Sequence, residues 1–211
     1  MEQHDEGYIV VDLDGTLIEE SAPYLVLLKE LFFEKPLKIL SAAILYLFIG
    51  PNKFTINTLQ KNIDRLCLTC AMNIKLRFNK ALVHFLKQLQ EANKILILAT
   101  GSDECIGMHI AQVMYKFFQI RFSYVIGSTP GFLCVSENKL AKVRSTIPSP
   151  FIYIGNSAQD YPLWRANDVK MICVGNSSFK RMAELSCRKP AVLIPPDFQS
   201  TQQIVASLTG T

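Results

Sequence analysis

Two carboxylates, Asp12 and Asp14, lie one residue apart directly after a short apolar stretch, Tyr8–Val11. A run of aromatic and β-branched residues indicates a buried strand, and Gly15 and Thr16 indicate that the chain turns after it. If the strand continues to Asp14, both carboxylates point to one side at its carboxyl end, where open α/β sheets bind ligands. Two like charges held together are costly, so a bound cation or a catalytic role is favoured over an acidic turn.

The composition is that of a globular protein with one core and a modest insertion: 211 residues, 49% hydrophobic, 19% charged, with a formal net charge of +4. Lysines and arginines are scattered along the chain, which argues against nucleic acid as a partner. The six cysteines follow no regular spacing, so free thiols in a reducing, cytoplasmic compartment are expected. Cys67 and Cys70 have the spacing of half a zinc or redox site, without a second close pair.

Residues 20–79 differ in pattern from the rest and predict a helical cap inserted after the first strand. The second of three expected helices, Pro36–Ile49, is apolar nearly all round. It either forms the cap's own core or docks on a membrane surface, an apolar substrate or a partner domain. The longest uncharged run, Ile39–Asn52, is shorter than the about 18 residues that a membrane-spanning helix needs. Polar residues 1–7 argue against a signal peptide, and residues 200–211 are expected to be a tail or linker.

Strand and helix patterns alternate from residue 80 onward, which predicts a doubly wound parallel sheet. The expected fold class is therefore α/β, with a Rossmann-like core in residues 1–19 and 80–199. Strands after the first are expected at 95–99, 123–126, 151–154, 169–174 and 191–194. Helices are expected at 81–90, 104–118, from about 138, 161–166 and 179–187. The strand ends should converge on one edge of the sheet.

The stretch Asp12-Leu13-Asp14-Gly15-Thr16 resembles the first motif of the haloacid dehalogenase (HAD) superfamily. The resemblance implies that Asp12 is the nucleophile and Asp14 the acid and base of a phosphatase. Dehalogenating relatives lack a carboxylate at the second position and the related cation-pumping ATPases carry a Thr there, so phosphatase is the leading activity. Thr100 closes an apolar strand as the Thr or Ser of the second motif does, which implies that its hydroxyl and the N–H of Gly101 bind phosphate.

Lys139 stands at an expected helix start, as the lysine of the third HAD motif does. The resemblance implies that it neutralises the phosphoryl group and reduces repulsion between Asp12 and Asp14. Lys142, one turn later, is the alternative.

Gly155-Asn156-Ser157-Ala158-Gln159-Asp160 is similar to the fourth HAD motif, with Asn156 where the family usually has a carboxylate. The resemblance implies a Mg²⁺ ion held by Asp12, the backbone carbonyl of Asp14, Asn156 and, directly or through water, Asp160. An amide carbonyl is a hard oxygen ligand without charge, so weaker metal binding or a greater dependence on Asp160 is expected. An inactive chain remains an alternative.

The four motifs occur in order between Tyr8 and Asp160. The sequence as a whole resembles the HAD-like domain that precedes UbiA-type prenyltransferases. The segments Leu98–Asp103 and Gly155–Trp164 carry this resemblance, which covers most of the chain from Tyr8 to about Leu185.

Together these expectations predict a magnesium-dependent phosphohydrolase that acts on a phosphomonoester through an aspartyl-phosphate intermediate. Aromatic residues in the cap, such as Tyr24, Phe32 and Tyr46, favour an aryl phosphate or protein phosphotyrosine, so the substrate is a phosphorylated small molecule or a phosphoprotein. One alternative is a catalytically weak phosphate-binding or scaffold module whose cap docks a partner or membrane. Others are a phosphomutase and a lipid or small-metabolite phosphatase.

Overall fold

The computed structural model describes residues 7–19, 76–194 and 204–205. Residues 20–75, which include the expected helix Pro36–Ile49 and almost all of the expected cap, lie outside the described residues, as does most of the expected tail. None of the described helices is both long and apolar enough to cross a membrane.

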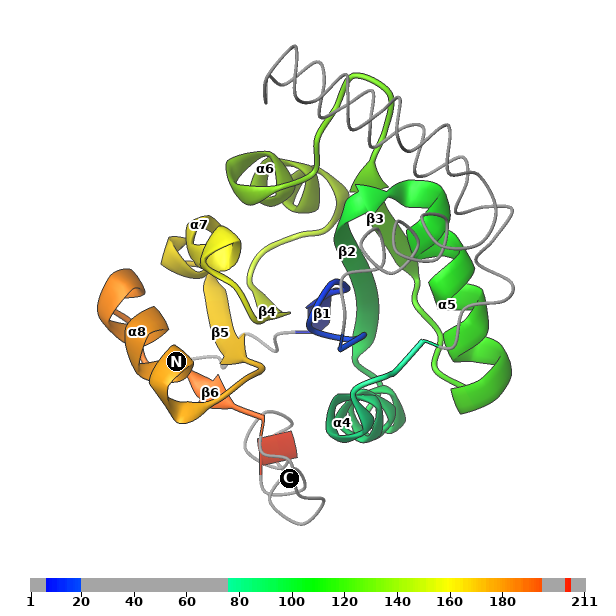
Figure 1. Cartoon of the computed structure of the whole chain (residues 1–211), viewed down its shortest axis with the longest axis horizontal. Helices are drawn as coiled ribbons and strands as arrows, with labels where there is room; N and C mark the ends of the chain where they lie inside the picture. Colours follow the sequence, from blue (N-terminus) through cyan, green and yellow to red (C-terminus); the bar gives the residue numbers. More distant parts are fainter. Residues whose placement is uncertain (1–6, 20–75, 195–203, 206–211) are drawn as a thin grey trace, which may run out of the picture.

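Six parallel strands form one sheet in the order β3-β2-β1-β4-β5-β6, which confirms the predicted α/β architecture (Figure 1). The chain order reverses between β1 and β4, and ligands of doubly wound sheets bind at the carboxyl ends of the strands at this switch point. The strands are β1 (Tyr8–Asp12), β2 (Ile95–Asp103), β3 (Tyr124–Ser128), β4 (Phe151–Gly155), β5 (Val169–Cys173) and β6 (Val192–Leu193).

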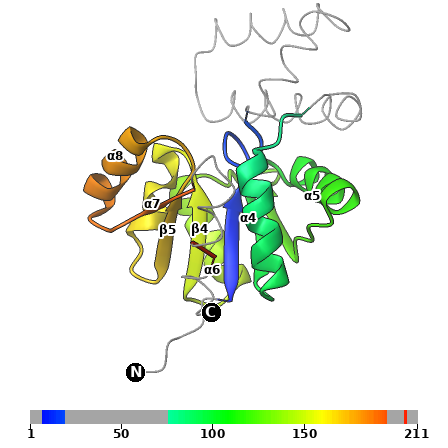
Figure 2. The same ribbon diagram turned by 90° about the horizontal axis from the view of Figure 1, so that it is seen from below.

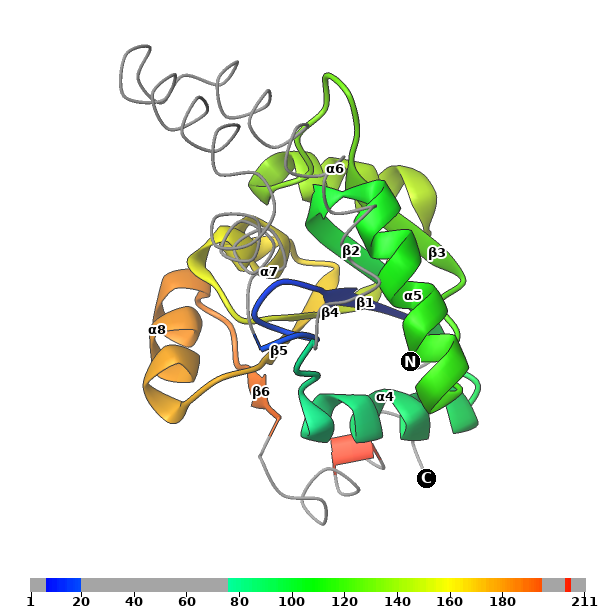
Figure 3. The same ribbon diagram turned by 45° about the vertical axis from the view of Figure 1, so that its right-hand side comes forward.

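Helices cover both faces of the sheet. One face packs against α4 (Lys80–Glu91) and α5 (Glu104–Phe118), which lie on the same side of the sheet in Figure 3. The other face packs against α6 (Ser136–Thr146), α7 (Tyr161–Arg165) and α8 (Ser177–Cys187), with the short 3₁₀ turn η2 (Ala158–Asp160) before α7.

The alternation of side chains along β1 assigns each residue to a face. Ile9 and Val11 are fully buried against the α4 and α5 side, whereas Val10 is buried against the α6, α7 and α8 side. Because side chains alternate along a strand, Asp12 at the end of β1 belongs to the second side. Figure 2 shows β1, β4 and β5 running upright side by side, with α4 in front of the sheet.

Several predicted boundaries differ from the structure at the carboxyl edge, among them the end of β2 and the start of α6. β2 continues to Asp103, whereas the sequence predicts that it ends at Ala99. The register between β2 and β3 shifts between these two residues, and the backbone of β2 stays extended past this irregularity. α6 begins at Ser136 instead of near Asn138; the residue before it is Val135, which provides no side-chain cap that the sequence could reveal.

The first strand ends at Asp12 and does not continue to Asp14. The carbonyl oxygen of Leu13 accepts backbone N–H bonds from residues 16, 17 and 18, which turns the chain directly after the strand. Gly15 has a φ of +74°, and a Cβ there would collide with the side-chain amide of Asn156. The positive φ therefore favours glycine at this turn, and a Cβ there would push the Asn156 side chain aside.

Candidate active site

The carboxyl edge at the switch point brings together residues from four separate elements. Asp12 ends β1, Thr100 lies on the neighbouring β2, and Asn156 follows β4 on the other side. Lys139 reaches the same place from the first turns of α6. The convergence of strand ends that the sequence predicted is therefore present in the structure.

Asp12 and Lys139 form a buried ion pair, with 2.7 Å between Lys139 Nζ and Asp12 Oδ1. Both residues are only 5% exposed. The second oxygen of Asp12 accepts a hydrogen bond of 3.0 Å from the Thr16 hydroxyl. Each carboxylate oxygen thus has its own donor, which fixes the orientation of the group. Lys142, the alternative lysine, is exposed on the surface of the helix.

Asp14 is oriented by two hydroxyl groups from β2. Its Oδ2 accepts hydrogen bonds from Thr100 Oγ1 (2.9 Å) and Ser102 Oγ (3.0 Å). The Thr100 hydroxyl also accepts a bond of 2.9 Å from the backbone N–H of Ser102. In this arrangement Thr100 directs its proton at Asp14, so its predicted contact with phosphate requires the hydroxyl to rotate. Ser102 was not anticipated, although its spacing of two from Thr100 gives both side chains the same direction.

Gly101 lies between these two residues, and its carbonyl oxygen accepts a hydrogen bond of 2.6 Å from the Ser128 hydroxyl. The same hydroxyl oxygen accepts a bond of 2.9 Å from the backbone N–H of Cys134. Ser128, at the end of β3, therefore fixes the backbone whose N–H is expected to bind phosphate.

Asp160 is buried and organises the loop that carries Asn156. Its Oδ2 accepts hydrogen bonds from the backbone N–H groups of Asn156 (3.1 Å) and Ser157 (3.0 Å). Ser157 and Asp160 form a reciprocal capping box at the start of η2. The other oxygen accepts a bond of 2.8 Å from the Tyr153 hydroxyl. Because both oxygens are engaged, the geometry favours an indirect, water-mediated role for Asp160 at a metal over direct ligation.

Lys139 lies close to two carboxylates of this cluster. Its Nζ is 2.7 Å from Asp12 Oδ1 and 3.9 Å from Asp160 Oδ1. Burial raises the pKa of Asp12 to about 7, opposed by Lys139, while repulsion from Asp160 and Asp14 raises it further. Burial lowers the pKa of Lys139, but the attraction of Asp12 and Asp160 outweighs it and raises the pKa overall, so the lysine stays charged.

The donors at this edge fit a magnesium ion. Among the described residues, no three Asp, Glu, His or Cys side chains converge as a ready-made metal cluster. Mg²⁺ is, however, usually held by one or two carboxylates, neutral oxygens, water and a substrate phosphate. The Asp12 carboxylate, the Asp14 backbone carbonyl and the Asn156 amide are oxygens of this kind.

Stabilisation by Mg²⁺ is expected to increase with pH. A folded pKa of about 7, above the ordinary 3.8, means that the folded protein binds more protons than the unfolded chain between these values. Ionisation of Asp12 therefore lowers stability as the pH rises through this window, and a cation reverses the penalty. The rise in Tm with Mg²⁺ should be larger at pH 8 than at pH 6, measured by calorimetry. Asp12→Asn should remove this difference; an equal shift in the variant would contradict it.

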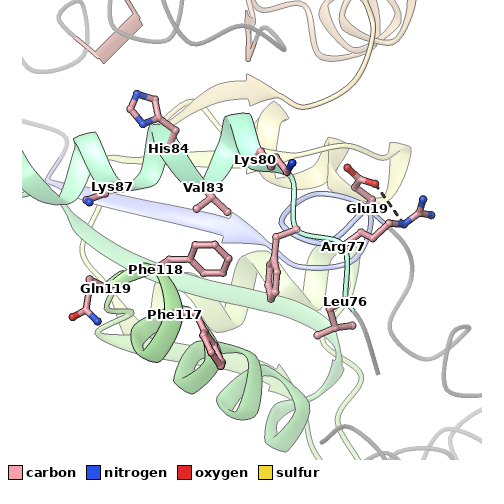
Figure 4. Close-up of a pocket in the computed structure, with 11 residues that line it drawn as sticks. Glu19, Leu76, Arg77, Lys80, Val83, His84, Lys87, Phe117, Phe118 and Gln119 are labelled. Carbon is pink, nitrogen blue, oxygen red and sulfur yellow. Dashed lines mark ion pairs between the residues drawn. The ribbon is translucent and has the colours of Figure 1, made fainter. Parts of the chain in front are cut away.

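A groove of about 950 Å³ lies on the other side of the sheet, between α4 and the end of α5 (Figure 4). Glu19 and Arg77, which flank the undescribed segment 20–75, form an ion pair of 3.7 Å at one end of it. None of the site residues lines the groove, so it is separate from the carboxylate cluster. Its lining residues are Glu19, Leu76, Arg77, Phe78, Lys80, Val83, His84, Lys87, Phe117, Phe118 and Gln119.

No family model matches this sequence. An uncharacterised protein, y4nM, of Sinorhizobium fredii is 26% identical over 161 residues, which are 75% of this chain. The match spans 28% of the length of that relative.

Solved structures establish the fold. A predicted phosphatase from Clostridium acetobutylicum superimposes with a TM-score of 0.63 at 16% identity, covering 95% of this chain and 98% of its own. A haloacid dehalogenase-like hydrolase from Streptococcus pneumoniae gives 0.61 at 17%, covering 96% and 98%. A phosphoserine phosphatase, solved as an analogue of its phospho-aspartyl intermediate, gives 0.55 at 11%, covering 95% and 99%. The core therefore has the fold of HAD-type hydrolases.

Proposed function

We propose that this protein is a magnesium-dependent phosphatase that hydrolyses phosphomonoesters through a phosphorylated Asp12. The observation that carries the proposal is the buried ion pair between Asp12 and Lys139 at the switch point, with Asp14 two residues further on. A buried carboxylate with a strongly raised pKa in such a position is typical of functional sites. The fold shared with HAD-type phosphatases supports the same reading.

In the first step, an Asp12 carboxylate oxygen attacks phosphorus and the bond to the leaving oxygen breaks. Asp14 donates its proton to that oxygen, which departs as an alcohol or phenol. Lys139, whose ammonium is 2.7 Å from Asp12, compensates charge on the phosphoryl oxygens. The Thr100 hydroxyl and the backbone N–H of Gly101 supply further donors to these oxygens.

In the second step, Asp14, now ionised, takes a proton from water, and the resulting hydroxide attacks phosphorus. The bond between phosphorus and the Asp12 oxygen breaks, which restores the carboxylate and releases inorganic phosphate. The Ser102 hydroxyl, 3.0 Å from Asp14 Oδ2, holds Asp14 in the direction of β2 between these steps.

Mg²⁺, when bound, neutralises charge between the phosphate and the carboxylates. Asp12, the backbone carbonyl of Asp14 and Asn156 are the residues proposed to hold it. Asp160 would act behind them, because it fixes the backbone of the Asn156 loop with two N–H···O bonds.

An aryl phosphate, protein phosphotyrosine included, is the proposed substrate class, based on the aromatic residues of the expected cap. The first test is release of phosphate from para-nitrophenyl phosphate with and without Mg²⁺, followed by phosphotyrosine peptides, phospholipids and sugar phosphates. Magnesium-dependent turnover supports the enzyme; a product in which phosphate has moved to another hydroxyl would favour a phosphomutase.

Asn156→Asp is expected to lower the half-saturating Mg²⁺ concentration by about tenfold, because a carboxylate adds a charge to a neutral oxygen ligand. Magnesium titration of para-nitrophenyl phosphate hydrolysis measures the change. Asn167→Asp, the same substitution at an exposed position between α7 and β5, is the matched control and should leave the titration unchanged. An Asn156→Asp titration that overlies the wild type would remove Asn156 from the metal site.

The competing proposal is a phosphate-binding or scaffold module in which Asn156 has weakened the metal. It gains support if the wild type releases no phosphate and Asn156→Asp acquires activity. The nearly all-round apolar pattern of the expected helix Pro36–Ile49 supports the further proposal that this helix docks on a partner domain or a membrane surface.

A further inference from the structure

The hydroxyl group of Tyr153 lies between the ammonium group of Lys139 and the carboxylate of Asp160. Its oxygen is 3.1 Å from Lys139 Nζ and 2.8 Å from Asp160 Oδ1. Tyr153 is in the middle of β4, is fully buried, and packs on the sheet face that carries α6. Lys139 and Asp160 themselves are 5% and 1% exposed, so all three polar groups are shielded from solvent.

The chemistry of the three groups fixes the direction of both hydrogen bonds. An ammonium group can only donate, so the Tyr153 oxygen accepts from Lys139. The single phenolic proton is then directed to Asp160, which accepts it as a carboxylate. Two of the three Lys139 protons are thereby committed, one to Asp12 and one to Tyr153, which leaves the third for a phosphoryl oxygen.

The same hydroxyl keeps Lys139 and Asp160 apart. Lys139 Nζ is 3.9 Å from Asp160 Oδ1, about 1 Å longer than a direct charge-assisted hydrogen bond. In a buried environment the attraction between these charges is strong, and contact would be favoured if nothing intervened. Direct contact between Lys139 and Asp160 would draw Lys139 away from Asp12. It would also disturb the N–H···O bonds by which Asp160 fixes the Asn156 loop.

We propose that Tyr153 is a positioning residue that holds Lys139 on Asp12 and keeps Asp160 on the backbone of the Asn156 loop. The proposal deepens the proposed phosphatase function and rests on it for its kinetic consequences. Through this one hydroxyl, Lys139, the group proposed to bind phosphate, is coupled to the loop proposed to hold the metal. Removal of the hydroxyl should therefore weaken both the stabilisation of the phosphoryl group and the binding of Mg²⁺.

The packing of the Tyr153 ring is separable from the role of its hydroxyl. The ring meets Trp164 edge to face, with 6.2 Å between centroids, and the indole N–H of Trp164 donates to the backbone carbonyl of Tyr153. Phenylalanine preserves both contacts. Tyr153→Phe therefore removes the hydroxyl alone, and a loss of packing does not complicate the result.

Tyr153→Phe is expected to lower kcat/KM for para-nitrophenyl phosphate by about tenfold and to raise the half-saturating Mg²⁺ concentration by a similar factor, the size of effect seen for groups behind a metal site. Its crystal structure should show Lys139 Nζ within about 3 Å of Asp160. Tyr161→Phe is the matched control, because Tyr161 also packs on Trp164 and makes no contact with Lys139 in the structure. It should leave both kinetic values unchanged.

A lower Tm with unchanged kcat/KM and Mg²⁺ titration would overturn the proposal, because it would show a structural role alone. So would a variant structure in which the 3.9 Å separation persists. If the wild type has no phosphatase activity, the proposed function fails, but Mg²⁺ binding measured by calorimetry and the separation in the variant still decide the role of Tyr153. Should the variant not fold, a slowly exchanging Tyr153 hydroxyl proton in the NMR spectrum of the wild type supports the donation to Asp160, and its absence contradicts it.

Discussion

Asp12→Asn will lower kcat for phosphate release by at least about a thousandfold, because an amide cannot form the phosphorylated intermediate. The fold should survive, since Lys139 keeps Tyr153 and the nearby Asp160 as partners. Initial rates at saturating substrate and Mg²⁺ measure the effect, and circular dichroism checks the fold.

Asp168→Asn is the matched control for this variant. Asp168 also pairs with a basic side chain, that of Arg144, but it precedes β5 at the opposite edge of the sheet. Its rate should remain within about twofold of the wild type, because surface ion pairs contribute little. Retention of full activity by Asp12→Asn would exclude Asp12 as the nucleophile.

Lys139→Met will lower both activity and stability. We expect kcat/KM to fall by about 10²- to 10³-fold, the cost of removing one group that stabilises developing charge. Loss of one partner of a buried ion pair typically costs about 3–5 kcal/mol of folding free energy. The rival lysine provides the control: Lys142→Met, on the same helix but exposed, should change neither quantity appreciably.

The destabilisation of Lys139→Met should depend on pH in a defined direction. Lys139 lowers the pKa of Asp12, so its removal raises the folded pKa further above the ordinary 3.8. The ionised carboxylate is then more costly in the fold, and the stability lost relative to the wild type should be greater at pH 8 than at pH 5. Urea unfolding at the two pH values measures this, and a larger loss at pH 5 would contradict the assigned charge of Asp12.

The sheet and the placement of the main site residues could be predicted because they follow from strand ends. An apolar run that stops at Asp12, and another that stops before Asn156, place both residues at the carboxyl edge of a parallel sheet. Lys139 was favoured over Lys142 because an expected helix start faces the strand ends, and in the structure Lys139 forms an ion pair with Asp12.

The supporting contacts could not be predicted in the same way. Tyr153 lies within an apolar strand, Phe151–Ile154, where an aromatic residue is explained by burial alone. Its hydroxyl becomes meaningful only when β4 is seen beside β1 and beneath α6. The role of Asp160 in the loop could have been predicted, because Ser157 three residues earlier completes a capping-box pattern. The resemblance to the fourth HAD motif suggested a metal ligand instead.

The most direct test of the account is to look for the phosphoryl group on Asp12. The wild-type protein is mixed with Mg²⁺ and a phosphorus-labelled aryl phosphate, and the reaction is quenched in acid within one turnover. The protein is then digested, and its peptides are analysed by mass spectrometry. We predict a phosphoryl group on the peptide that contains Asp12, dependent on Mg²⁺ and missing in Asp12→Asn. Phosphate release by the wild type without this label, or a label that persists in Asp12→Asn, would contradict the proposed mechanism.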